Sequence, residues 1–150
     1  MKKWGLILLI MTSAIGFISL QLHNFAQDSS LSEWHKGLDG YVKSIRLQKD
    51  NSKPIAALFH TDWCPNCKKL REEILATPEF RQFAQENLIT VQINPELGPM
   101  ENKLAEEFGV FGYPSFFIIP ANSQKATMIR KTSHIPVTKF IQQINNAINS

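Results

Sequence analysis

The fold is decided by one stretch of the chain, IAALFHTDWCPNCKKL, which spans residues 55–70. It opens with five consecutive apolar residues, Ile55 to Phe59, a run that is too short for a helix and is typical of a buried strand. A helical pattern follows the cysteine pair, and Pro65 suits a first helical turn because its missing N–H is not needed there. The stretch therefore predicts a strand that leads into a helix, with Cys64-Pro65-Asn66-Cys67 at the junction.

This junction favours chemistry between two thiols. Cys64 lies at the predicted helix N-terminus, where unpaired N–H groups and the helix dipole favour a thiolate. A thiolate is the nucleophile of disulfide exchange. Cys67 lies one turn further in, from where it can attack the mixed disulfide that Cys64 forms. We therefore predict that Cys64 is the attacking thiol, nearer to the surface, and that Cys67 is the resolving thiol.

Two other interpretations of the pair stay open at this point. The chain has only two cysteines, so it cannot form a closed Cys₄ zinc site by itself. A periplasmic copper or zinc module using Cys64, Cys67 and a histidine, His60 or His134, remains an alternative, since soft thiolates suit Cu(I). A purely structural disulfide is also possible, although so small a loop removes little chain entropy.

Two motifs accompany the pair. Trp63 precedes it and Lys68 follows it, and the later segment FGVFGYPSFF spans residues 108–117. Together they resemble the thioredoxin superfamily, in which the proline that matches Pro114 is cis and packs beside the cysteines. Residues 77–80, 91–94 and 104–112 are also similar to the C-terminal thioredoxin-like domain of the DsbD family of thiol:disulfide interchange proteins. The resemblance covers roughly residues 53–120 and extends more loosely to residue 148.

The resemblance implies an α/β thioredoxin-like fold, with a central mixed β-sheet flanked by helices. It implies a thiol:disulfide oxidoreductase that acts on protein thiols and disulfides, as a reductase or electron relay rather than an oxidase. The redox-active disulfide Cys64–Cys67 would then suffice, without a bound cofactor or metal, and we expect a monomer. Trp63, Tyr113 and Pro114 would contact the substrate.

The sequence departs from the family at one informative position. Many members place a buried carboxylate six residues before the first cysteine, as the proton acceptor for the second thiol, but here that position is Leu58. His60, two residues further on the same strand face, is a candidate for proton transfer because imidazole titrates in the useful range. The alternative is that His60 is only structural.

The N-terminus predicts export. Lys2 and Lys3 are followed by 19 uncharged, mostly apolar residues, 4–22, close to the ~20 that span a bilayer. We favour an uncleaved anchor over a cleaved signal peptide, because the segment is long and the cleavage site after Ala26 is poor. Residues 1–26 would thus form the anchor or signal, residues 31–150 the thioredoxin-like domain. The domain would face the periplasm from the bacterial inner membrane, or be free in the periplasm after cleavage.

Composition excludes one class of partner. The chain is 43% hydrophobic and 19% charged, as in ordinary globular proteins. All 13 acidic residues lie beyond residue 26 and nearly balance the basic residues there. No basic stripe interleaved with aromatic residues is present, so nucleic-acid binding is not expected.

Further elements follow from periodicity and capping signals. We expect a first helix capped by Ser32, an active-site helix to about Ala76 and a helix capped by Thr77. The remaining expected elements are strands at 88–93, 115–119 and 126–130, the last two antiparallel, and helices at 101–108 and 137–148.

Overall fold

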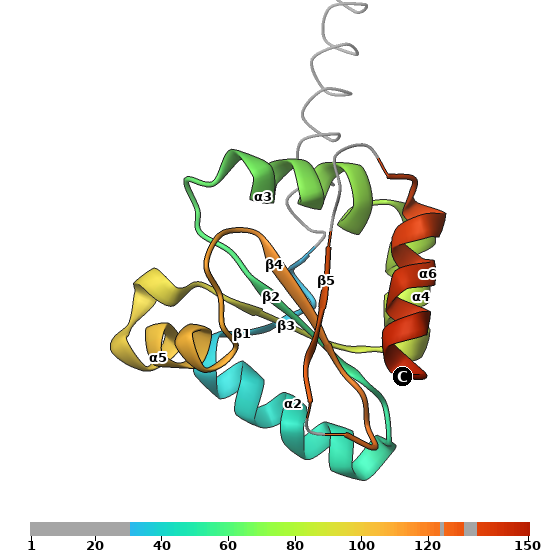
Figure 1. The fold of residues 1–150 in the computed structure, drawn as a ribbon, viewed down its shortest axis with the longest axis horizontal. Coiled ribbons are helices and arrows are strands. Elements are labelled where there is room, and N and C mark those ends of the chain that lie inside the picture. Colours follow the sequence, from blue (N-terminus) through green and yellow to red (C-terminus); the bar gives the residue numbers. More distant parts are fainter. Residues whose placement is uncertain (1–30, 124, 131–134) are drawn as a thin grey trace, which may run out of the picture.

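A five-stranded mixed sheet forms the centre of the protein (Figure 1). The computed structural model describes residues 31–123, 125–130 and 135–150. In spatial order the strands are β1 (His35–Lys36), β3 (Ile89–Ile93), β2 (Ile55–Phe59), β4 (Ser115–Ile119) and β5 (Thr127–Ile129). β1, β3 and β2 are parallel, whereas β4 and β5 are antiparallel to their neighbours. The predicted mixed sheet is therefore confirmed.

Helices cover both faces of this sheet (Figure 1). One face carries α3 (Pro65–Leu70), the π-helical turn η2 (Arg71–Leu75), α4 (Pro78–Asn87) and α6 (Val137–Ile148). The opposite face carries α2 (Gly37–Asn51) and α5 (Pro99–Glu107). A single-turn 3₁₀ helix, η3 (Pro95–Leu97), connects β3 to α5. The flanking helices predicted from the resemblance are thus present.

The central strand β2 supplies both halves of the core, because successive side chains of a strand point to opposite faces. Ala56 and Leu58 belong to the first core cluster, beneath α3, η2, α4 and α6. Ile55, Ala57 and Phe59 belong to the second core cluster, beneath α2 and α5. All five residues of β2 are buried. This double burial explains why β2 appears in the sequence as an unbroken apolar run rather than an alternating one.

The first helix does not begin where we predicted. Ser32 is not its N-cap; the chain first forms the short strand β1, and α2 begins at Gly37 with Lys36 at the N-cap position. Gly37 has a φ of +63°, a left-handed conformation that glycine adopts without steric cost. A Cβ at Gly40 would lie 2.8 Å from the His35 backbone. The two glycines therefore permit the tight passage from β1 into α2.

The other predicted elements lie close to those observed. α6 spans the predicted 137–148, and Thr77 caps α4 by accepting the Phe80 N–H at 3.2 Å. The active-site helix reaches Leu75, but its second half is a π-helical turn that the sequence did not predict. β4 has the predicted bounds 115–119, whereas β3, β5 and α5 differ from prediction by one or two residues at their ends. The predicted membrane or signal segment, residues 1–26, lies outside the described residues, and within those residues no helix is long and apolar enough to cross a bilayer.

Candidate active site

The cysteine pair lies where β2 leads into α3, as the sequence predicted. Cys64 and Cys67 form a disulfide with a Cα–Cα distance of 5.2 Å. Cys64 is the N-cap of α3, Pro65 follows at the first helical position, and Cys67 lies within the first turn. A short loop joins Phe59 at the end of β2 to this helix, and the Cys64 N–H donates to the Thr61 carbonyl at 3.4 Å.

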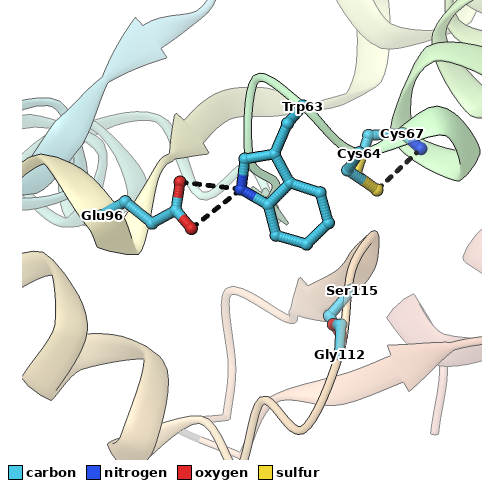
Figure 2. The surroundings of a disulfide bond; sticks show 6 residues. All are labelled: Trp63, Cys64, Cys67, Glu96, Gly112 and Ser115. Atoms are coloured by element: carbon cyan, nitrogen blue, oxygen red, sulfur yellow. Dashed lines mark hydrogen bonds between the residues drawn. A yellow bond between two sulfur atoms is a disulfide. The ribbon is translucent and has the colours of Figure 1, made fainter.

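The sulfur of Cys64 occupies the capping position of its own helix. Its Sγ accepts the Cys67 N–H at 3.1 Å (Figure 2). An N–H donor and the positive end of the helix dipole therefore lie against this sulfur, and both stabilise negative charge there when the disulfide is reduced. We predicted that Cys64 lies nearer to the surface than Cys67, but the two differ little in exposure: Cys64 is 5% exposed and Cys67 is 4% exposed. Helix position, rather than exposure, distinguishes the two thiols.

The loop that contains Pro114 lies near the disulfide, on the side away from α3. The Tyr113–Pro114 peptide bond is cis, which confirms the prediction. Gly112 and Ser115, which flank this dipeptide, lie below the disulfide in Figure 2, and the Ser115 hydroxyl donates to the Gly112 carbonyl at 2.8 Å. Tyr113 is half-buried against the second core cluster. The structure thus places the loop between Gly112 and Ser115 near the cysteine pair, from a segment distant in sequence.

Trp63 projects from the same end of the sheet. Its side chain is 68% exposed, and its Nε1–H donates to both carboxylate oxygens of Glu96, at 2.9 and 3.1 Å (Figure 2). Glu96 was not predicted from the sequence, because nothing local to residues 94–97 shows that they meet a tryptophan 33 residues earlier. The Asn94-Pro95 turn signal could have predicted the turn, but not its neighbour.

His60 is buried close to this loop. It is 8% exposed, and its backbone N–H donates to the Ile93 carbonyl at 3.0 Å. The ring Nδ1 has no hydrogen-bond partner among the described residues. Burial lowers the pKa of His60 below its ordinary 6.5 and the nearby Arg71 guanidinium lowers it further, while Asp62 partly opposes the shift. Leu58 belongs to the first core cluster, and side chains two residues apart on a strand point to the same face, so the alternation continued to His60 directs the imidazole to the face that α3 and η2 cover.

The position of the family's buried carboxylate is apolar here. Leu58 is buried within the first core cluster, so no acidic group enters the core from that point of β2. Asp62, Glu72 and Glu73 are all exposed. Glu72 pairs with Lys68 at 3.8 Å along the helix surface. Of the ionisable side chains considered for proton transfer, His60 is therefore the one in a buried position.

The metal alternative required a third ligand beside the two sulfurs. Within residues 31–123, 125–130 and 135–150, no group of three or more His, Cys, Asp or Glu side chains is placed to hold a metal ion. His134, one of the two candidate histidines, lies outside the described residues.

Comparison with known proteins assigns the family. The profile of the thioredoxin-like domain matches residues 41–148, which include the cysteine pair and Pro114. The chain belongs to the thioredoxin-like family. Among solved structures, DsbH oxidoreductase superposes with a TM-score of 0.62 at 23% identity, covering 78% of this chain and 84% of the other. The reduced C-terminal domain of Neisseria meningitidis DsbD gives a TM-score of 0.61 at 22% identity, covering 75% and 98% of the two chains. These likenesses confirm the thioredoxin-like fold.

Two curated relatives carry redox names. The disulfide bond reductase DsbH of Chlamydia pneumoniae is 27% identical over 111 residues, which are 68% of this chain and 67% of DsbH. The thiol:disulfide interchange protein DsbD of Neisseria meningitidis is 26% identical over 97 residues, which are 64% of this chain but only 16% of DsbD. This thioredoxin-like chain therefore spans a small part of DsbD, the part that the sequence resemblance indicated.

Proposed function

We propose that the chain is a thiol:disulfide oxidoreductase that exchanges disulfides with protein partners, as a reductase or electron relay. The observation that carries this proposal is the Cys64–Cys67 disulfide at the N-terminus of α3, beside the loop that contains Pro114. The name of DsbH, a disulfide bond reductase, supports the reducing direction. The names of the DsbD relatives support interchange between proteins.

The reaction proceeds in two exchanges. In the reduced chain the Cys64 thiolate attacks one sulfur of a partner disulfide, so a mixed disulfide forms and the partner's other sulfur leaves as a thiolate. Cys67 then loses its proton and attacks Cys64, which forms the intramolecular disulfide and releases the second partner thiolate. The partner gains two electrons, the pair loses two, and each partner thiolate takes up a proton. The helix N-terminus favours Cys64 for the first attack, because it stabilises the anionic sulfur.

The remaining site residues take supporting roles in this proposal. The loop with Tyr113 and Pro114 offers backbone groups to an extended partner segment, as in β-addition. Trp63 offers an exposed aromatic surface beside Cys64. His60, whose lowered pKa keeps it neutral at pH 7, accepts the proton that Cys67 releases. Leu58 stands where many family members have a buried carboxylate, so in this proposal His60 is the buried base for the second exchange.

We further propose that residues 1–26 anchor the chain in the bacterial inner membrane, with a monomeric thioredoxin-like domain, residues 31–150, in the periplasm. Support comes from Lys2 and Lys3 ahead of an uncharged stretch of 19 residues. Cell fractionation tests this part: we expect full-length chain in the membrane fraction. A shortened form in the soluble periplasmic fraction would instead indicate cleavage near Ala26.

Trapping of mixed disulfides tests the exchange reaction. Cys67→Ala should accumulate disulfide-linked partner adducts in cells, since Cys64 can attack but nothing resolves the product, whereas Cys64→Ala should give none. Equal trapping by both variants, or no adducts with either, would contradict the assigned roles. Anaerobic metal analysis of the reduced chain serves as the control, because one tightly held copper or zinc per chain without disulfide exchange would favour a metal module.

A further inference from the structure

Trp63 combines high exposure with a fixed orientation. An exposed side chain normally keeps rotamer freedom that it loses at an entropic cost when a partner covers it. Here the indole N–H is held by both oxygens of the Glu96 carboxylate, while 68% of the side chain remains open to solvent. A hydrogen bond to a charged acceptor is stronger than a neutral one, so the ring is oriented before any partner arrives.

Glu96 is itself held by a rigid turn. Asn94 is buried at the end of β3, and its side-chain Oδ1 accepts the Glu96 N–H at 3.0 Å. Its carbonyl accepts the Leu97 N–H at 3.2 Å. Pro95, also buried, fixes the backbone at the first position of η3. The carboxylate is therefore presented from a capped turn rather than from a loose loop.

The ring held in this way lies on the surface that surrounds the disulfide. In Figure 2 the indole lies between Glu96 and the cysteine pair, with the Gly112–Ser115 loop beneath it. Leu97, next to Glu96, is 75% exposed, and Phe111, next to Gly112, is fully exposed. Each of these two exposed apolar side chains is therefore next in sequence to a residue that Figure 2 places around the disulfide.

We propose that Glu96 is a positioning residue, which orients the Trp63 indole for contact with the protein partner and thereby strengthens partner docking. The inference rests on the proposed exchange function. Glu96 acts through Trp63 and not on the cysteines, so it affects the partner's apparent affinity and leaves the reactivity of Cys64 unchanged.

Kinetics with two substrates test this assignment on the full-length chain. One substrate is a protein disulfide, that of insulin, and dithiothreitol serves as the electron donor. The other substrate is oxidised glutathione, which is too small to cover Trp63. We expect Glu96→Ala to raise KM for insulin about three- to tenfold, the loss of one hydrogen bond's net energy. The kcat for insulin and the rate constant with oxidised glutathione should stay at wild-type values. Glu96→Gln should stay within about twofold of wild type, because the amide oxygen still accepts the indole N–H.

A double-mutant cycle shows whether Glu96 acts through the indole. Trp63→Phe keeps an aromatic ring but removes the N–H, so adding Glu96→Ala to it should change KM no further. Additive effects would overturn the proposal, as would equal losses for Glu96→Ala and Glu96→Gln, which would indicate an effect of charge alone. Glu86→Ala is the matched control, since Glu86 also accepts a side-chain N–H, from Gln82 at 3.0 Å, on the exposed surface of α4.

A second readout does not depend on exchange activity. The chain has three tryptophans, and Trp63→Phe identifies which indole N–H signal in a ¹H–¹⁵N spectrum belongs to Trp63. Solvent exchange of that signal should be slowed in wild type and accelerated in Glu96→Ala. If this change occurs but neither substrate is reduced by wild type, the proposed function fails while the Glu96–Trp63 contact stands. If the signal does not change, the positioning role fails whatever the kinetics.

Discussion

Each face of the sheet buries its own core cluster, but the two faces contribute differently to the site. The face under α3, η2, α4 and α6 carries the helix that holds both cysteines, and His60 is buried at the end of the central strand that it covers. The face under α2 and α5 is apolar and aromatic, and Phe108, Val110 and Tyr113 pack against it. One face therefore fixes the disulfide and the other fixes the loop that contains Pro114. The site forms where the two meet, at the end of β2.

Removing one large aromatic side chain from each face tests this division. Phe140 lies in the first core cluster and Phe59 in the second, and both are fully buried. We expect Phe140→Ala and Phe59→Ala each to lower the free energy of unfolding by about 3–5 kcal/mol, since each leaves a cavity. Urea unfolding of the full-length chain measures this.

The two variants should then differ in function. The ring centroids of Phe59 and Phe108 are 5.0 Å apart, so Phe59→Ala loosens the segment that leads to Pro114 and should raise KM for a protein disulfide. Phe140 packs on Phe80 and Phe116 and makes none of the ring contacts that hold Phe108, so its loss should leave this KM unchanged. Equal KM effects would show that the faces do not act separately.

Leu58 is the position at which an acidic group can be introduced into the first core cluster. Leu58→Asp buries a carboxyl group among apolar side chains, and we expect a loss of about 2–4 kcal/mol at neutral pH. Burial raises the pKa of that carboxyl in the folded state, so the folded chain binds the proton to higher pH than the unfolded chain. Stability should therefore fall as pH rises above about 4. Leu58→Asn is the control: it should destabilise without this pH dependence, and a pH-independent loss in both variants would contradict the prediction.

His60 should produce a smaller pH effect on stability, of opposite sign to that of Leu58→Asp. Its pKa is lowered by burial and by Arg71, so below pH 6.5 the unfolded chain binds a proton that the folded chain does not. The contribution of neutral His60 to the free energy of unfolding is therefore fully present above pH 6.5, and it is lost as the pH falls from 6.5 towards the lowered pKa of the folded chain. His60→Asn should flatten this acid slope, by at most one proton. His35, whose pKa is lowered by burial and by Lys43, is the less buried comparison, and His35→Asn should flatten the slope less.

Local signals predicted much of this arrangement. The apolar run of β2, Pro65 at the start of α3, Thr77 at the cap of α4 and the matching of Pro114 to a family proline each depend on residues close in sequence. The start of α2 was misplaced because Gly37 and Gly40 permit a tight passage from β1 into α2, which helical periodicity does not record. β1 has two residues, too few for a pattern.

The parts of the site that escaped prediction are those set by tertiary contact. Glu96 meets Trp63 because the ends of β2 and β3 are neighbours in the sheet, so the contact follows from strand order and not from spacing. The small difference in exposure between Cys64 and Cys67 likewise depends on what packs over them. The π-helical turn η2 has no signal in residues 71–75 that we can identify.

The brevity of the outermost strands limits self-association. Among the described residues, β1 ends the sheet with two residues, one of them Lys36, and β5 ends it with three. Long flat edges with unpaired backbone groups recruit strands from other chains, whereas short or charged edges do not. In the proposed exchange, an extended partner segment would therefore find few free backbone groups at the sheet margins, and we expect it to pair at the Pro114 loop, near Cys64.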